Sequence, residues 1–71
     1  MEYIRVQYDQ HDIRDVLANG NVIGPTETEL ALPPNFYVIT LSGGGYTPPS
    51  WSGVVAGTLP DRPPRIQFNK I

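Results

Sequence analysis

Four side chains that could bind a metal ion or transfer a proton are grouped in the segment 9–15, which reads DQHDIRD: Asp9, His11, Asp12 and Asp15. Calcium-binding loops place acidic residues at alternating positions, with a glycine among them and a bidentate glutamate further along the chain. Segment 9–15 lacks both that glycine and that spacing. The pattern favours a solvated loop or the start of a helix, and we predict no metal ion and no other cofactor.

His11 is the one histidine available as the base of a hydrolytic site. Such a site needs a nucleophile within reach and an acid that orients the histidine. The serines at positions 42, 50 and 52 are the candidate nucleophiles, but no nucleophile-elbow motif surrounds them. A small β-sandwich is also not expected to hold a deep pocket that excludes water. We therefore expect His11 to be an exposed loop residue and the chain not to be an enzyme.

Three consecutive glycines stand in the segment 42–51, SGGGYTPPSW, and glycine-rich loops can bind phosphate. A P-loop continues with Gly-Lys-Ser/Thr and opens a helix, and a dinucleotide-binding loop has the spacing G-x-G-x-x-G. Here the residues YTPP follow, and the two prolines are incompatible with a regular helix or strand ladder. The glycines therefore predict a turn between two strands.

The aromatic residues near this turn are the better candidates for binding. Tyr46 and Trp51 could stack on sugars or anchor a protein interface, where tyrosine and tryptophan are enriched. The alternative is that Trp51 caps one end of the core, with Tyr46 closing the loop over it. The structural role is favoured for Trp51 because the only tryptophan is the largest burial contribution available. We take Tyr46, Trp51 and Tyr37 as the candidate binding residues.

Length, charge and composition narrow the classes of protein. A chain of 71 residues forms one domain at most and has a modest core, so stabilisation by a partner chain, including a second copy, is an option. The absence of cysteine excludes a disulfide scaffold. With a net charge of −2 and no basic run, nucleic-acid binding is disfavoured. No apolar run approaches the roughly 20 residues of a membrane span.

The first ten residues, MEYIRVQYDQ, lack the basic head and apolar region of a secretory signal. The chain as given is therefore expected to stay in the cytoplasm. An excised domain with an added Met1 would have the same start, so an excised or exported domain stays an open alternative.

The elements that would position these residues are short β-strands separated by glycine and proline. Ile4, Val6 and Tyr8 alternate with polar residues, which is typical of a half-buried strand. The expected strands are 2–8, 15–18, 21–24, 28–32, 36–42, 51–58 and 65–69. Their spacing predicts an all-β fold, a small antiparallel β-sandwich of six or seven short strands that covers residues 1–71.

Two interpretations of the segment that begins at Asp9 are open. In one, Asp9 caps a helix that presents Ile13 and Val16 on one face and ends at Gly20. In the other, a loop leads to a strand, and Asn19 and Gly20 form a two-residue hairpin turn, because both tolerate positive φ. The second interpretation is favoured.

The segment 36–42, FYVITLS, is the strongest strand signal and is apolar on both faces as far as Thr40. Such a run is typical of a central strand that is covered on both sides. At the sheet edges, unpaired backbone groups could accept an added strand from a partner. The prolines at positions 60, 63 and 64 are expected to guard one of these edges.

The order of residues 16–48 resembles the PEGA domain, a small β-sandwich module. Its pattern has an Asp-Gly or Asn-Gly turn, a short strand with a Gly-x-Thr step, a proline-glycine turn, and a long strand that leads into a Gly-Tyr pair. The corresponding residues here are Asn19–Gly20, Gly24 and Thr26, Pro33–Pro34–Asn35, Tyr37 to Leu41, and Gly45–Tyr46.

The resemblance covers about half of the chain and departs from the family at its signature. The Pro-Glu-Gly-Ala tetrapeptide is absent, and HDIRD stands near its place. Asn35 replaces the turn glycine, which is tolerable because asparagine can adopt the left-handed conformation. PEGA-like modules are non-catalytic and are thought to bind proteins or cell-surface polymers such as polysaccharides.

The sequence thus predicts a non-catalytic interaction module that binds a protein partner or a cell-surface polymer. Its interface is expected at an edge strand or at the aromatic end near Tyr46. The alternative is a structural subunit that is stabilised by homo-oligomerisation in a larger assembly.

Overall fold

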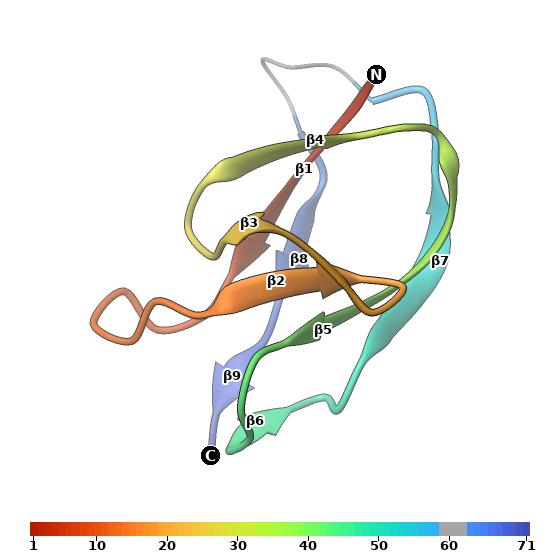
Figure 1. The fold of residues 1–71 in the computed structure, drawn as a ribbon. Helices are drawn as coiled ribbons and strands as arrows, with labels where there is room; N and C mark the ends of the chain where they lie inside the picture. The colour runs from red at the N-terminus through yellow and green to blue at the C-terminus, as the bar shows by residue number, and fades with distance from the viewer. Residues whose placement is uncertain (59–62) are drawn as a thin grey trace.

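The computed structural model describes residues 1–58 and 63–71, and in these residues it contains β-strands and no helix (Figure 1). The strands are β1 (Glu2–Gln7), β2 (Asp15–Ala18), β3 (Asn21–Pro25), β4 (Glu29–Leu32), β5 (Asn35–Leu41), β6 (Tyr46–Thr47), β7 (Trp51–Val55), β8 (Arg65–Gln67) and β9 (Asn69–Lys70). The all-β prediction is confirmed. The two strands beyond the predicted number, β6 and β9, have two residues each.

The strands form two main sheets and one short ribbon. A three-stranded sheet has the order β4-β1-β8, and a four-stranded sheet has the order β3-β2-β5-β7. All neighbours are antiparallel except β1 and β8, which run parallel. The antiparallel ribbon of β6 and β9 lies at the end of the molecule where the C-terminus is found (Figure 1).

The inner faces of the two main sheets share one hydrophobic core. Ile4 and Val6 of β1 are fully buried, as their alternation with polar residues predicts, and Tyr8 is nearly so. From the four-stranded sheet, Val16 and Ile39 point into the same core. The other buried apolar side chains are Ala18, Leu30, Leu32, Tyr37, Leu41, Val55, Ile66 and Phe68.

The segment that begins at Asp9 forms a loop followed by a hairpin, so the favoured interpretation is confirmed and the helical one is wrong. Asn19 and Gly20 have φ values of 51° and 84°, the positive values that a type I′ turn requires between two twisted strands. The side chain of Asn19 also accepts a hydrogen bond from the Val38 N–H at 2.8 Å, which ties the turn to β5.

The prediction for the 36–42 segment is correct about its position and wrong about its covering. Strand β5 is central, with β2 on one side and β7 on the other. Its inward residues are buried, but Phe36 and Val38 on the outer face are 53% and 38% exposed. Among the described residues, no element forms a layer over that face. Strand β5 thus carries more apolar side chains than the core of one chain buries.

The last predicted strand is divided into two. Arg65–Gln67 pairs with β1, whereas Asn69–Lys70 pairs with β6. Phe68 lies between the two pieces, is fully buried, and donates its N–H to the Gln7 carbonyl at 2.8 Å.

The prolines at positions 63 and 64 precede β8, an edge strand of the three-stranded sheet, and their role in guarding that edge stays a prediction. Pro60 lies outside the described residues. Within the part of the chain that the structure describes, there is no helix long and apolar enough to cross a bilayer.

Candidate functional site

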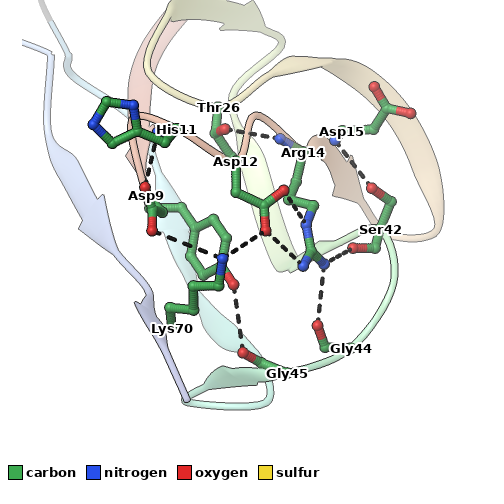
Figure 2. A network of polar contacts seen from close by, with 11 residues as sticks. Asp9, His11, Asp12, Arg14, Asp15, Thr26, Ser42, Gly44, Gly45 and Lys70 are labelled. Atoms are coloured by element: carbon green, nitrogen blue, oxygen red, sulfur yellow. Dashed lines mark hydrogen bonds and ion pairs between the residues drawn. The ribbon is translucent and has the colours of Figure 1, made fainter.

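The glycine-rich turn is held by Arg14, which sequence reasoning did not single out. The Arg14 Nη1 atom donates to the carbonyls of Ser42 and Gly44 at 2.8 and 3.1 Å. Its Nε and Nη2 atoms donate to the two carboxylate oxygens of Asp12, both at 2.9 Å (Figure 2). The guanidinium group therefore connects segment 9–15 to the turn that follows β5.

The carbonyl of Gly45, at the end of the turn, also accepts hydrogen bonds. It accepts hydrogen bonds from the Ile71 N–H at 3.0 Å and from the Tyr8 hydroxyl at 3.4 Å. Gly43 has a φ of 73°, and a Cβ atom there would lie 2.8 Å from Arg14 Nη1. Glycine is thus required at position 43 both by the backbone and by the approach of the arginine.

We call this arrangement the Arg14 clamp, comprising Arg14, Asp12 and residues 42–45. A phosphate-binding loop directs backbone N–H groups at its ligand. In the clamp, by contrast, the carbonyl oxygens of the turn are directed at a cation and at hydroxyl and amide donors. The geometry is that of a polar cross-link within the fold.

The Asp12–Arg14 pair shifts the ionisation of both groups. The hydrogen bond from Arg14 lowers the pKa of the Asp12 carboxyl below its ordinary value of 3.8, against a smaller opposing effect of desolvation. The same hydrogen bond raises the pKa of the Arg14 guanidinium. Both groups are therefore charged at neutral pH, which strengthens the clamp.

Asp9, another acidic residue of segment 9–15, contacts His11 and shares Lys70 with Asp12. Asp9 accepts a hydrogen bond from the His11 N–H at 2.8 Å, while the His11 ring is exposed and directed away from the clamp (Figure 2). Lys70 Nζ lies 3.4 Å from Asp12 Oδ2 and 3.9 Å from Asp9 Oδ2. Across residues 1–58 and 63–71, no three His, Asp or Glu side chains are grouped as metal ligands would be.

Tyr46, the first candidate binding residue, packs into an aromatic cluster behind the clamp. Its ring meets Phe68 edge to face at 5.4 Å between centroids, and Tyr8 at 6.4 Å. Its hydroxyl donates to the Leu41 carbonyl at 3.1 Å and accepts from the Leu41 N–H at 3.2 Å. The ring is half-buried, and the hydroxyl both donates and accepts a hydrogen bond within the chain. Little of Tyr46 therefore remains to contact a partner.

Tyr37, the second candidate, lies in the core. Its ring is buried, and its hydroxyl donates to the carbonyl of Pro33, two residues before the same strand begins. This hydrogen bond satisfies the one polar group that a buried tyrosine brings into a core.

Trp51, the third candidate, differs because it borders an open cavity. The indole packs against the core and is half-buried. It lies along β7 over Gly53, where an added Cβ atom would be 3.0 Å from the ring carbon Cη2. Gly53 therefore allows the ring to lie flat along the strand.

The cavity opens between β7 and β8, where the two main sheets are not joined, and has a volume of about 460 Å³. Its lining consists of Ile4, Trp51, Val54, Val55, Ala56, Gly57, Thr58, Pro64, Arg65 and Ile66. The cavity is open to solvent and is not a deep pocket that excludes water. It lies where β7 and β8 are edge strands of different sheets, and among the described residues no backbone ladder closes this side.

The β7 strand is itself an unguarded edge. It pairs with β5 on one side, and no described strand pairs with the other side. Its sequence, WSGVV, has no charged residue and no proline. The other edges carry the features that discourage strand addition: Pro25 in β3, Glu29 in β4, and Arg65 after two prolines in β8.

No family model, no curated protein and no solved structure matches this chain. The resemblance to the PEGA domain therefore stays a prediction.

Proposed function

We propose that this chain is a non-catalytic interaction module that binds an extended segment of a protein partner as an additional strand beside β7. A side chain of that segment would occupy the cavity next to Trp51. The observation that carries the proposal is the coincidence of an unguarded strand edge with an open cavity on the same side of the molecule.

The backbone of β7 supplies the first part of the recognition. An edge strand has a row of N–H and C=O groups that can pair with an incoming strand, and such main-chain hydrogen bonds bind an extended peptide whatever its sequence. Because β7 has no charge and no proline, neither electrostatic repulsion nor a missing donor opposes this pairing.

The cavity supplies the second part, which is selectivity. Side chains of an added strand alternate between the two faces of the sheet. In β7 the residues Trp51, Gly53 and Val55 are directed inward. The inward side chains of a strand added beside β7 would therefore enter the region between the two sheets, where the cavity lies.

The size and lining of the cavity indicate what it would accept. A volume of about 460 Å³ lies within the range of roughly 300–1,000 Å³ found for ligand sites. Trp51, Val55 and Ile66 make much of its wall apolar. The partner segment is therefore expected to carry a large aliphatic or aromatic residue at the position that faces inward.

A protein partner is favoured over a polysaccharide because few aromatic ring faces are open to solvent. Sugar binding by stacking needs open ring faces. Tyr46 packs against Phe68, and Tyr37 is buried, so Trp51 is the one candidate with access to a cavity. The resemblance to the PEGA domain supports the same broad function, since it implies a non-catalytic binding module.

Selection from a displayed library of random peptides, followed by titration of Trp51 fluorescence, tests the proposal. Selected peptides should share a large apolar residue and should change the emission of Trp51. Ala56→Phe should fill the cavity and weaken binding about tenfold or more, which corresponds to roughly 1.4 kcal/mol. The matched control is Ala31→Phe, on the exposed face of β4, which should bind as the wild type does.

The proposal fails if selected peptides leave Trp51 fluorescence unchanged. It also fails if Ala56→Phe, shown by circular dichroism to be folded, binds them as tightly as the Ala31→Phe control does.

A further inference from the structure

The turn between β2 and β3 contains the dipeptide Asn19–Gly20, and the Asn19 side chain extends the pairing of β2 with β5. Its Oδ1 atom accepts a hydrogen bond from the Val38 N–H at 2.8 Å, and its Nδ2 atom donates to the Phe36 carbonyl at 3.3 Å. The backbone N–H of Asn19 donates to the Val38 carbonyl at 3.0 Å. The side-chain amide thus acts as an additional peptide group at the end of the strand ladder.

These contacts fix the orientation of the Asn19 amide. The Val38 N–H can pair only with the amide oxygen, and the Phe36 carbonyl can pair only with the amide NH₂ group. Both ends of the amide are therefore held on the β5 side of the turn. While they are held, the amide carbon Cγ is not free to rotate towards the backbone nitrogen of the next residue.

That next residue, Gly20, leaves the approach to the amide open. A Cβ atom placed on Gly20 would meet no atom within 4 Å, and both turn residues are exposed. Among residues 1–58 and 63–71, the Gly20 N–H donates to no backbone carbonyl outside the strand ladders. The other asparagines precede residues with larger side chains: Asn21 precedes Val22, Asn35 precedes Phe36, and Asn69 precedes Lys70.

We propose that Asn19 is a site of spontaneous deamidation and that the attachment of its amide to β5 controls the rate. The Gly20 nitrogen forms a bond to Asn19 Cγ and gives its proton to solvent. The Cγ–Nδ2 bond breaks, and the NH₂ group takes a proton from solvent and leaves as ammonia. Water then opens the cyclic imide at either carbonyl, which gives aspartate or isoaspartate at position 19.

Both products differ from the native turn. Each adds a negative charge beside β5, and neither can donate to the Phe36 carbonyl, because a carboxylate presents acceptors alone. Isoaspartate also adds a carbon atom to the main chain of a two-residue turn whose geometry is set by the φ values of Asn19 and Gly20. The modification is therefore a one-way change at this end of the sheet.

The first step requires the end of the hairpin to detach from β5, and it does not require the rest of the fold to open. Two hydrogen bonds should slow the reaction in the folded chain by roughly 10- to 100-fold, where each factor of ten corresponds to about 1.4 kcal/mol. Global unfolding is much rarer, with less than about one chain in a thousand unfolded. The size of the rate reduction therefore distinguishes local detachment from global unfolding.

The experiment measures conversion at each asparagine by ion-exchange chromatography and peptide mass spectrometry, during incubation at neutral pH in buffer and in urea. Asn19 should convert in both, more slowly in the folded chain by roughly 10- to 100-fold. The internal controls Asn21, Asn35 and Asn69 should remain unchanged. Arg14→Met, at the opposite end of β2, removes the Arg14 clamp and should leave the folded-state rate at Asn19 unchanged.

Three outcomes would overturn the inference. Conversion at Asn19 in urea no faster than at the internal controls would show that it is not a site. Equal rates in buffer and in urea would show that attachment to β5 does not control the reaction. A folded-state rate reduced more than about a thousandfold, or one that rises as Arg14→Met lowers stability, would assign the reaction to global unfolding.

Discussion

The Arg14 clamp and the β7 side of the four-stranded sheet differ in how many of their polar and apolar groups already have a partner within the chain. At the clamp, the carbonyls of Ser42, Gly44 and Gly45 all accept hydrogen bonds from Arg14, Tyr8 or Ile71. At the β7 side, one backbone edge, a cavity and much of an apolar face have no partner in the described part of the chain. The glycine-rich turn, which resembles a phosphate-binding loop, belongs to the first region.

This difference indicates where a binding partner would be recognised. Groups that already satisfy one another must be separated before they can bind a ligand, and the separation costs free energy. Exposed apolar area and unpaired strand edges are available at no such cost. Substitutions at the clamp should therefore change stability, whereas substitutions beside β7 should change binding.

The largest effect is expected for Arg14→Met. It removes the donor to the Ser42 and Gly44 carbonyls and the partner of Asp12, and should lower the free energy of unfolding by about 1–3 kcal/mol. Urea denaturation would measure this loss. Arg65→Met removes an exposed arginine of β8 and should change stability by less than about 0.5 kcal/mol. Equal losses in the two variants would contradict a special role for the clamp.

A smaller effect is expected for Gly43→Ala. The residue has a φ of 73°, and the new Cβ atom would lie 2.8 Å from Arg14 Nη1. The left-handed conformation alone costs an L-residue about 1–2 kcal/mol. The control is the adjacent Gly44→Ala, where the Cβ atom would meet no atom within 4 Å. In thermal denaturation Gly43→Ala should melt at a lower temperature than Gly44→Ala. Identical melting temperatures would show that Arg14 does not approach the turn at Gly43.

At the β7 side, Gly53→Ala should have a small effect on stability, below about 1 kcal/mol, and a clear effect on Trp51. The added Cβ atom would lie 3.0 Å from the end of the indole, so the ring must move by a few tenths of an ångström. The emission of Trp51 and the affinity for selected peptides should both change. Ser52→Ala, directed outward from the same strand, should leave the emission unchanged. An unchanged spectrum in Gly53→Ala would show that the ring does not lie along β7.

The smallest effect concerns pH. Hydrogen bonds from Arg14 and from the Thr58 backbone lower the pKa of the Asp12 and Glu2 carboxyls below their ordinary values of 3.8 and 4.5. A lowered pKa in the folded state contributes stability at pH values above the ordinary pKa, and this contribution is lost as the pH falls through the folded-state value. Stability should therefore decline below about pH 4.5. The stability of Asp12→Asn should decline less steeply with falling pH than that of the wild type. An equally steep decline would contradict the pairing of Asp12 with Arg14.

The strands were predictable from sequence because they depend on local patterns. The alternation of Ile4 and Val6, and the turn at Asn19 and Gly20, are set by neighbours within a few residues. The division of the last strand was not predictable. Phe68 is buried on the expected face, but whether the next residues pair with β1 or with β6 depends on strands far away in the sequence.

The sites also depend on contacts between segments that are far apart in the sequence, and these contacts could not be predicted. Arg14 contacts carbonyls 28 and 30 residues away, and no spacing in the sequence connects them. The cavity beside Trp51 exists because β7 and β8 are edges of different sheets, which is a property of topology. The apolar face of β5 was visible in the sequence. That no described element covers it was not, because the pattern does not reveal whether a covering layer is present.

The most direct test of the account is an NMR titration of the isotopically labelled chain with a peptide selected from the displayed library. The account predicts that the largest chemical-shift changes lie in β7, at Trp51 and in the residues around the cavity, with little change in residues 42–45. Changes concentrated at the Arg14 clamp, with β7 unaffected, would contradict it.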